Sequence, residues 1–117
     1  MLSGCSTEES DVIRVGTPFN NDGTTGVKIH KEITDSESIA SLRELIDKEQ
    51  NIEEPTDLSL EPEIYFSLDR PSESVSEIAR DVWLIDDGTA ILYEDGSESY
   101  SILTREQTNE LLSILEH

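Results

Sequence analysis

Paired carboxylates are the residues of this 117-residue chain whose spacing most readily suggests chemistry. Asp86-Asp87 and Glu94-Asp95 each place two acids side by side. A glycosidase needs two carboxyl groups about 5 to 10 Å apart across a cleft. However, a glycine follows each pair, and aspartate before glycine is favoured by the geometry of tight hairpin turns alone. We therefore interpret both pairs as turn residues and predict no catalytic residue.

Metal, imidazole and hydroxyl chemistry have weaker support. Neither acidic turn has the alternating acids and distant glutamate of an EF-hand, so no metal site is predicted, although weak cation binding stays open. His30 and Glu32 share one face of a predicted strand and could act as an acid or base, but a partly exposed strand histidine is the simpler interpretation. The serines lack a Gly-x-Ser-x-Gly elbow, and no glycine-rich phosphate loop occurs. We predict neither a Ser-His hydrolase nor a cofactor.

Three aromatic side chains form the candidate binding face. Trp83 and Tyr93 have the same parity in neighbouring predicted strands, and with Tyr65 they could form a patch on an uncovered sheet face. Such a patch could bind peptide, glycan or protein. The alternative is that the three rings only pack the sheet or lie under a helix.

The charge balance limits the partners of the protein. The chain has 27 Asp and Glu residues against 8 Lys and Arg, a formal net charge of -19. We expect no nucleic-acid binding, because it depends on basic side chains that release counterions from phosphates. No run of about 18 apolar residues predicts a membrane span, and one cysteine allows no intrachain disulfide. We expect a monomer with an acidic, solvated surface.

The two ends of the chain are predicted to lie outside the fold. Leu2-Ser3-Gly4-Cys5 resembles the lipobox that ends a bacterial lipoprotein signal peptide, and Cys5 is the position that carries a diacylglyceryl group in that pattern. Two acyl chains give stable membrane attachment. The alternative is a free cysteine. Residues 1–25 are then a lipobox remnant and a flexible polar tether, which could include a short strand at residues 12–15. Residues 115–117 read as the start of a purification tag.

Apolar alternation predicts one domain over residues 26–114. Residues 27–33 alternate as a half-buried strand. Thr34 and Glu37 have the spacing of a capping box, and the apolar stripe that follows predicts a helix ending near Gln50. Residues 53–57 are predicted to form a loop, because proline disfavours helical geometry in the residue before it.

The second half of the chain is predicted to be rich in strands. Residues 64–68 alternate as a second strand. Residues 80–86, 89–94 and 98–103, separated by Asp-Gly turns, predict a three-stranded antiparallel meander. Thr104 begins another capping-box pattern and a short closing helix. The fold class is therefore α+β: strand, helix, four strands, helix, with an antiparallel sheet of about four to five strands and both helices on one face.

Several motifs of residues 64–114 occur together: Ile64-Tyr65-Phe66, Val82-Trp83-Leu84-Ile85-Asp86-Asp87-Gly88 and Ala90-Ile91-Leu92, with Asp95-Gly96, Tyr100 and the Thr104-led helix. In these motifs the segment resembles the small lipoprotein domains called YhfM-like, found in Bacillus-type Gram-positive bacteria. The resemblance implies a surface lipoprotein and supplies no catalytic residue.

These observations predict a non-enzymatic binding or accessory module, lipid-anchored at the outer face of the cytoplasmic membrane. Its expected partners are the membrane through Cys5 and another envelope protein or wall material. The alternatives are a carboxylate-dependent hydrolase acting on envelope glycans, and a structural spacer with no ligand. An enzyme should show a concave pocket with converging acids of perturbed pKa, whereas a binding module should show a shallow exposed face.

Overall fold

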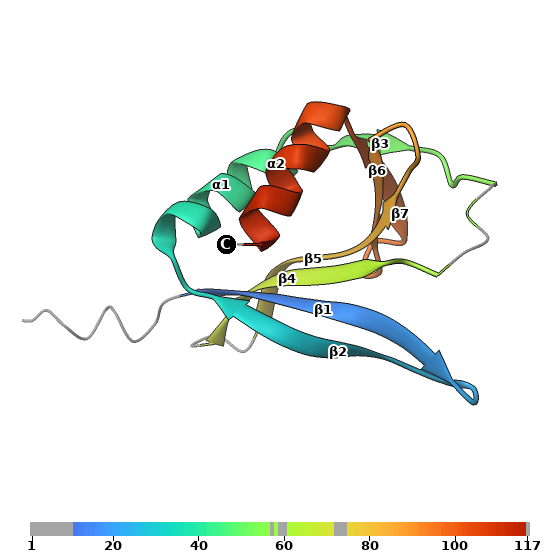
Figure 1. Ribbon diagram of the computed structural model, residues 1–117, viewed down its shortest axis with the longest axis horizontal. Helices are drawn as coiled ribbons and strands as arrows, with labels where there is room; N and C mark the ends of the chain where they lie inside the picture. Colours follow the sequence, from blue (N-terminus) through green and yellow to red (C-terminus); the bar gives the residue numbers. More distant parts are fainter. Residues whose placement is uncertain (1–10, 57, 59–60, 72–74, 117) are drawn as a thin grey trace, which may run out of the picture.

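The computed structural model describes residues 11–56, 58, 61–71 and 75–116, which form one antiparallel sheet and two helices (Figure 1). The sheet follows the order β2-β1-β4-β5-β6-β7-β3. In chain order the elements are β1 (Val12–Asn21), β2 (Thr24–Ile33), α1 (Ser36–Ile46), β3 (Gln50–Ile52), β4 (Ile64–Arg70), β5 (Val75–Leu84), β6 (Ala90–Glu94), β7 (Ser99–Leu103) and α2 (Arg105–Leu115).

The predicted sheet of about four to five strands is wrong, because the sheet has seven strands within the described residues. The prediction omitted β1 and β3. β1 covers residues 12–21 of the segment assigned to the tether, where the sequence analysis allowed only a short strand at residues 12–15. Its register shifts between Val15 and Gly16, which interrupts the two-residue alternation that would have marked a ten-residue strand. β3 has only three residues and is defined by its pairing with β7, which no local pattern reveals.

The β1–β2 hairpin is the longest in the molecule. Its turn places Asp22 at φ 55° and Gly23 at φ 82°, the left-handed conformations that a two-residue hairpin turn requires. At Gly16 the two strands approach so closely that an added Cβ would lie 2.7 Å from the backbone oxygen of Lys28. A glycine is therefore needed where the register shifts.

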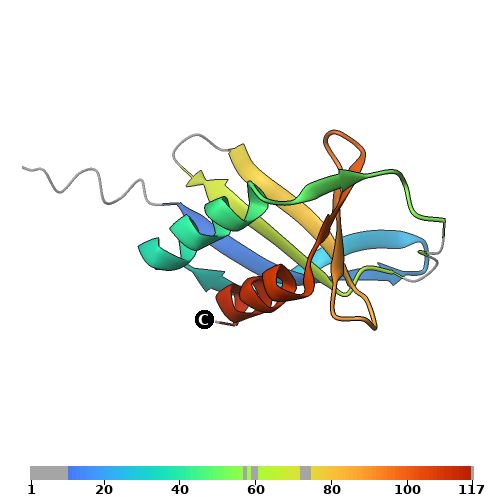
Figure 2. The same cartoon turned by 90° about the horizontal axis from the view of Figure 1, so that it is seen from above.

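Both helices lie over one face of the sheet (Figures 1 and 2). The N-cap of α1 is Asp35, one residue beyond the predicted Thr34, and its Oδ2 accepts a hydrogen bond of 2.9 Å from the Ser38 backbone N–H. The predicted capping box of α2 is confirmed, since Thr104 and Gln107 exchange side-chain and backbone hydrogen bonds.

The core lies between the helices and the inner face of the sheet. Its fully buried large side chains come from four central strands, from β1 and from both helices: Ile13, Leu42, Leu45, Phe66, Leu68, Val82, Leu92, Leu103 and Leu111. The opposite face has no helix over it within the described part of the chain (Figure 1). That uncovered face carries the candidate site.

β5 is twice as long as its neighbour β6. β6 pairs only with residues 81–84 of β5, whereas β4 pairs with β5 from Val75 to Val82. The first part of β5 therefore extends past the β6–β7 hairpin (Figure 2). Among the described strands, residues 75–80 have β4 on one side and no partner on the other. We call this stretch the open edge of β5.

Candidate functional site

The three aromatic residues predicted as a binding face lie on strands β4, β5 and β6. Tyr93 is opposite Tyr100 in the β6–β7 ladder, and their ring centroids are 4.8 Å apart. Trp83 lies 6.3 Å from the same Tyr100 ring. Tyr65 is separated from Tyr93 by one strand, since Asp81 pairs with both residues. All four rings are partly exposed, so the sheet itself does not bury them.

Tyr100 was missed by the sequence analysis, although a signal was present. A two-residue Asp95-Gly96 turn would pair Tyr93 with Glu98, but strand parity alone already places Tyr100 on the same face as Tyr93. The longer observed turn places the two tyrosines directly opposite each other. Tyr100 therefore extends the aromatic surface by one strand.

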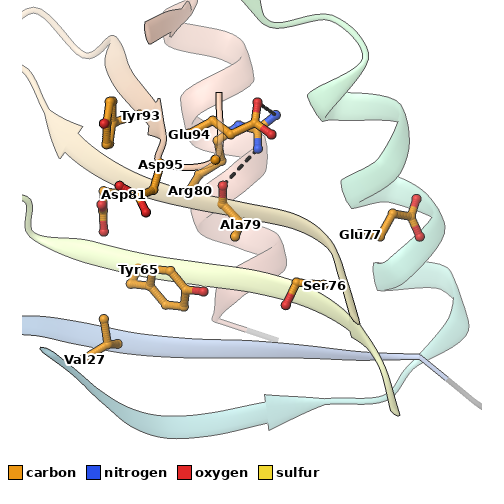
Figure 3. A pocket seen from close by; sticks show the side chains of 11 residues that line it. Val27, Tyr65, Ser76, Glu77, Ala79, Arg80, Asp81, Tyr93, Glu94 and Asp95 are labelled. Carbon is orange, nitrogen blue, oxygen red and sulfur yellow. Dashed lines mark hydrogen bonds and ion pairs between the residues drawn. The ribbon is translucent and has the colours of Figure 1, made fainter. Parts of the chain in front are cut away.

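A cavity of about 440 Å³ opens beside this aromatic surface (Figure 3). We call it the β5 cavity. Its walls include the Tyr65 and Tyr93 rings, the carboxylates of Asp81 and Asp95, and Ala79 on the open edge of β5. Figure 3 shows Asp81 between the two tyrosines with Asp95 beside it. The cavity thus combines aromatic and anionic walls.

Asp81 is the most unusual acid in the β5 cavity. Burial raises the pKa of its carboxyl group above the ordinary range, and the negative charge of Asp95 raises it further. Asp81 is half-buried, whereas Asp95 is exposed at the rim of the cavity. Burial also raises the pKa of the Tyr65 hydroxyl, which therefore stays neutral at physiological pH. Neither cause of the raised Asp81 pKa is a cation, although the Arg80 guanidinium lines the same cavity.

Arg80 provides a guanidinium group at the border of this cavity. Its side chain is only 8% exposed, and its Nη2 donates to Glu49 Oε2 at 2.6 Å while its Nε donates to Glu49 Oε1 at 3.2 Å. Its Nη1 donates to the backbone oxygen of Ala79 at 2.9 Å, and Glu94 lies 3.8 Å away (Figure 3). The chain itself thus shows how a guanidinium is held beside the open edge.

Of the other residues considered for chemistry, Glu94 and Asp95 line the β5 cavity, whereas Asp86, Asp87 and His30 are not among its lining residues. Asp87 accepts hydrogen bonds from the Thr89 backbone N–H and from Thr89 Oγ1, and these bonds lower its pKa as expected for a turn aspartate. Asp86 is exposed beside it. His30 is exposed on the edge strand β2. Over the described ranges no group of three or more His, Cys, Asp and Glu side chains could hold a metal ion.

Some features from the sequence analysis fall elsewhere. Cys5, with its lipobox-like surroundings, and His117 lie outside the described residues. Leu115 ends α2 and is buried against the core, so this residue of the expected tag takes part in the fold. None of the helices in the described ranges is long and apolar enough to cross a membrane.

No family model matches the chain, and neither does any curated protein. Among solved structures, the fold is similar to that of a thioesterase-like protein from Clostridium sporogenes ATCC 15579. The similarity has a TM-score of 0.59 and 17% sequence identity, and it covers 88% of this chain and 91% of the other. At this identity the similarity establishes a shared fold alone.

Proposed function

We propose that this protein is a non-enzymatic binding module that captures a cationic group in the β5 cavity. The observation that carries the proposal is the half-buried Asp81 carboxylate set between the Tyr65 and Tyr93 rings, with Asp95 at the rim. A carboxylate that has lost part of its hydration gains most from a charged hydrogen-bond donor. Aromatic faces add attraction for the same cation. The net charge of -19 draws such a ligand toward the protein.

The ligand is an organic cation with a polar head, of which a guanidinium or primary ammonium group is the simplest example. Inorganic cations are less suited, because no three acids among the described residues are arranged to hold a metal ion, and because the β5 cavity has aromatic walls. Arg80 and Glu49 illustrate the preferred geometry, with two donors on one carboxylate.

We expect Asp81→Asn to weaken binding of N-acetylarginine amide about tenfold, because a charge-assisted hydrogen bond contributes roughly 1.5–3 kcal/mol. Titration followed by NMR at low salt measures the dissociation constant. N-acetylcitrulline amide, a neutral ligand of similar shape, should bind the parent protein no better than it binds the variant. Asp86→Asn removes the same charge from an exposed turn and should change the affinity less than about twofold. Equal affinities for arginine and citrulline ligands would contradict the proposal.

The pH dependence has a definite sign. Only ionised Asp81 attracts a cation, so affinity should rise with pH through the raised pKa of Asp81 and be lost on acidification earlier than for an exposed aspartate. Stability runs the other way. Because the folded pKa is raised, the neutral acid stabilises the fold at low pH, and this contribution is lost as pH rises through that pKa. Asp81→Asn should therefore unfold at a temperature no lower than the parent at neutral pH, which separates lost binding from lost structure.

A carboxylate-dependent hydrolase is the second candidate. A raised pKa in a cavity suits a general acid or base, and the structural neighbour is described as thioesterase-like. The described walls of the β5 cavity contain neither His nor Cys, so Asp81 would have to activate water without an imidazole or thiol. Turnover of p-nitrophenyl esters, acyl-thioesters or glycans that Asp81→Asn abolishes would establish this candidate and overturn the non-enzymatic proposal.

We also propose that Cys5 anchors this module at the outer face of the cytoplasmic membrane, as in the YhfM-like lipoproteins that the sequence resembles. Two acyl chains bury enough methylene groups for stable attachment. Expression with a lipoprotein signal peptide and labelled palmitate should label the parent protein but not Cys5→Ser. Both should be made in equal amounts, as judged by immunoblot. Equal label in the two proteins would disprove the anchor and leave the β5 cavity unaffected.

A further inference from the structure

We propose that the cationic ligand is an extended basic peptide of a partner protein, which adds as a new strand along the open edge of β5. This inference rests on the proposed function and specifies its ligand class and binding mode. Strand addition satisfies backbone groups at an exposed edge, while side-chain cavities on either side provide specificity.

The direction of the backbone groups in β5 supports this mode. Ile85 donates its N–H to the Thr89 oxygen across the β5–β6 turn, so the peptide groups of Ile85 face the β6 side. Peptide groups of successive strand residues point to alternate sides, which places those of Ala79 on the β6 side too. β6 does not reach Ala79. The N–H and C=O of Ala79 therefore point from the open edge toward the space that an added strand would occupy.

Arg80 already occupies part of that space. Its Nη1 donates to the Ala79 oxygen where the N–H of a neighbouring strand would otherwise donate. Charged side chains at exposed edges are a common protection against uncontrolled strand pairing. A carbonyl oxygen has two lone pairs, so the N–H of an incoming peptide can share or replace this bond. The edge is thus protected from pairing until a suitable strand arrives.

Cavities lie along the open edge on both faces of β5. The β5 cavity includes Ser76 and Ala79 from this edge together with Asp81. A second cavity of about 480 Å³ includes Ile78 and Arg80 of the same edge with residues of α1 and β3. Because side chains of a strand alternate between faces, every second residue of an added strand would enter the β5 cavity. The acids there select Arg or Lys at those positions.

Charge complementarity also selects the partner. A second copy of this chain would bring another net charge of -19 to an acidic edge, which opposes self-association. A basic segment of another protein instead gains from the same field. The open edge accommodates a strand of about six residues, since it runs from Val75 to Arg80.

The test uses the whole 117-residue protein and a capped peptide of three Arg-Thr repeats. Two isomers carry backbone N-methyl groups, one on its arginines and the other on its threonines. We expect one isomer to lose affinity at least about tenfold and the other to bind like the parent peptide, because only alternate N–H groups face β5. A peptide with Glu in place of Arg should not bind.

Ala79→Pro tests the same edge from the side of the protein. It removes the N–H that faces the added strand but none of the hydrogen bonds to β4, and proline is tolerated at strand edges of this kind. We expect at least about tenfold weaker peptide binding in Ala79→Pro than in Ala79→Val, which changes the same wall of the β5 cavity but retains the N–H. Equal peptide affinities in these two variants would contradict strand addition. If Ala79→Pro does not fold, the peptide isomers still decide the question.

The outcomes separate the two proposals. Equal binding of both N-methylated isomers would overturn strand addition while leaving cation capture intact. Failure of N-acetylarginine amide and of every arginine peptide to bind would overturn both. Loss of peptide binding in one isomer only, together with a larger loss in Ala79→Pro than in Ala79→Val, is the result that strand addition predicts.

Discussion

Replacing Arg80 by alanine is expected to lower the free energy of unfolding by about 3 kcal/mol, because the substitution leaves a partly buried carboxylate without its cation. Glu49, the main partner, is only 14% exposed, and its carboxylate also accepts a hydrogen bond from Ser101 Oγ. Removing the guanidinium also releases the Ala79 oxygen. The cost arises from the uncompensated charge of Glu49 more than from the lost attraction itself.

Urea denaturation at neutral pH measures this effect, and two controls interpret it. Arg105→Ala removes an exposed arginine that donates to the Asp87 backbone oxygen, and it should cost no more than about 0.5 kcal/mol. Combining Arg80→Met with Glu49→Gln removes both charges, and the double variant should recover much of the lost stability. A loss below about 1 kcal/mol in Arg80→Ala would show that Glu49 is hydrated and that the ion pair does not fix the open edge.

The turns are the part of the fold that the sequence predicted best. The Asp-Gly pairs mark the two hairpin positions, and Gly88 has the positive φ of 94° that the first turn needs. In the second turn the left-handed residue is Glu98, at φ 54°, and the turn covers residues 95–98. A dipeptide therefore locates a turn, whereas the residue that takes the left-handed conformation depends on where the flanking strands stop pairing.

The strands were predicted less well, because a strand can form through its partner strands even where its own sequence pattern is weak. Strands β4 to β7 alternate clearly and lie at the centre of the sheet. β1 is also central, but its register shift, Pro18 and its terminal asparagines give it the composition of a turn-rich tether. β1 nevertheless buries Ile13 and Val15 against the core. Burial supplied by β4 and the helices outweighs the weak strand propensity of that segment.

The candidate site shows the same limit. Strand parity was enough to suggest that Tyr65, Trp83 and Tyr93 share a face. Asp81 was missed because it is one of 27 acidic residues, and nothing within its own strand distinguishes a half-buried aspartate from an exposed one. The burial of Asp81 depends on the neighbouring strands β4 and β6, in which Tyr65 and Tyr93 pair with it. The Arg80–Glu49 pair is similarly hidden, since it joins residues 31 positions apart.

Phe66→Ala is expected to have the largest effect on stability, about 4 kcal/mol, because it removes a fully buried ring and leaves a cavity in the core. Its neighbour Tyr65 lies on the opposite face of β4, at the β5 cavity. Tyr65→Ala should cost far less stability but should weaken N-acetylarginine amide binding about threefold, through the lost cation–π contact.

Denaturation and ligand titration of these two adjacent substitutions measure both quantities for each variant. The core substitution should change stability and leave the ligand affinity of the remaining folded protein within about twofold, since Phe66 faces the helices. Tyr65→Ala should weaken ligand binding and change stability little. If both variants lost stability equally and neither lost affinity, Tyr65 would be a packing residue, and the uncovered face would have no part in binding. Loss of stability in Phe66→Ala alone and loss of affinity in Tyr65→Ala alone would assign stability to one face of β4 and ligand binding to the other.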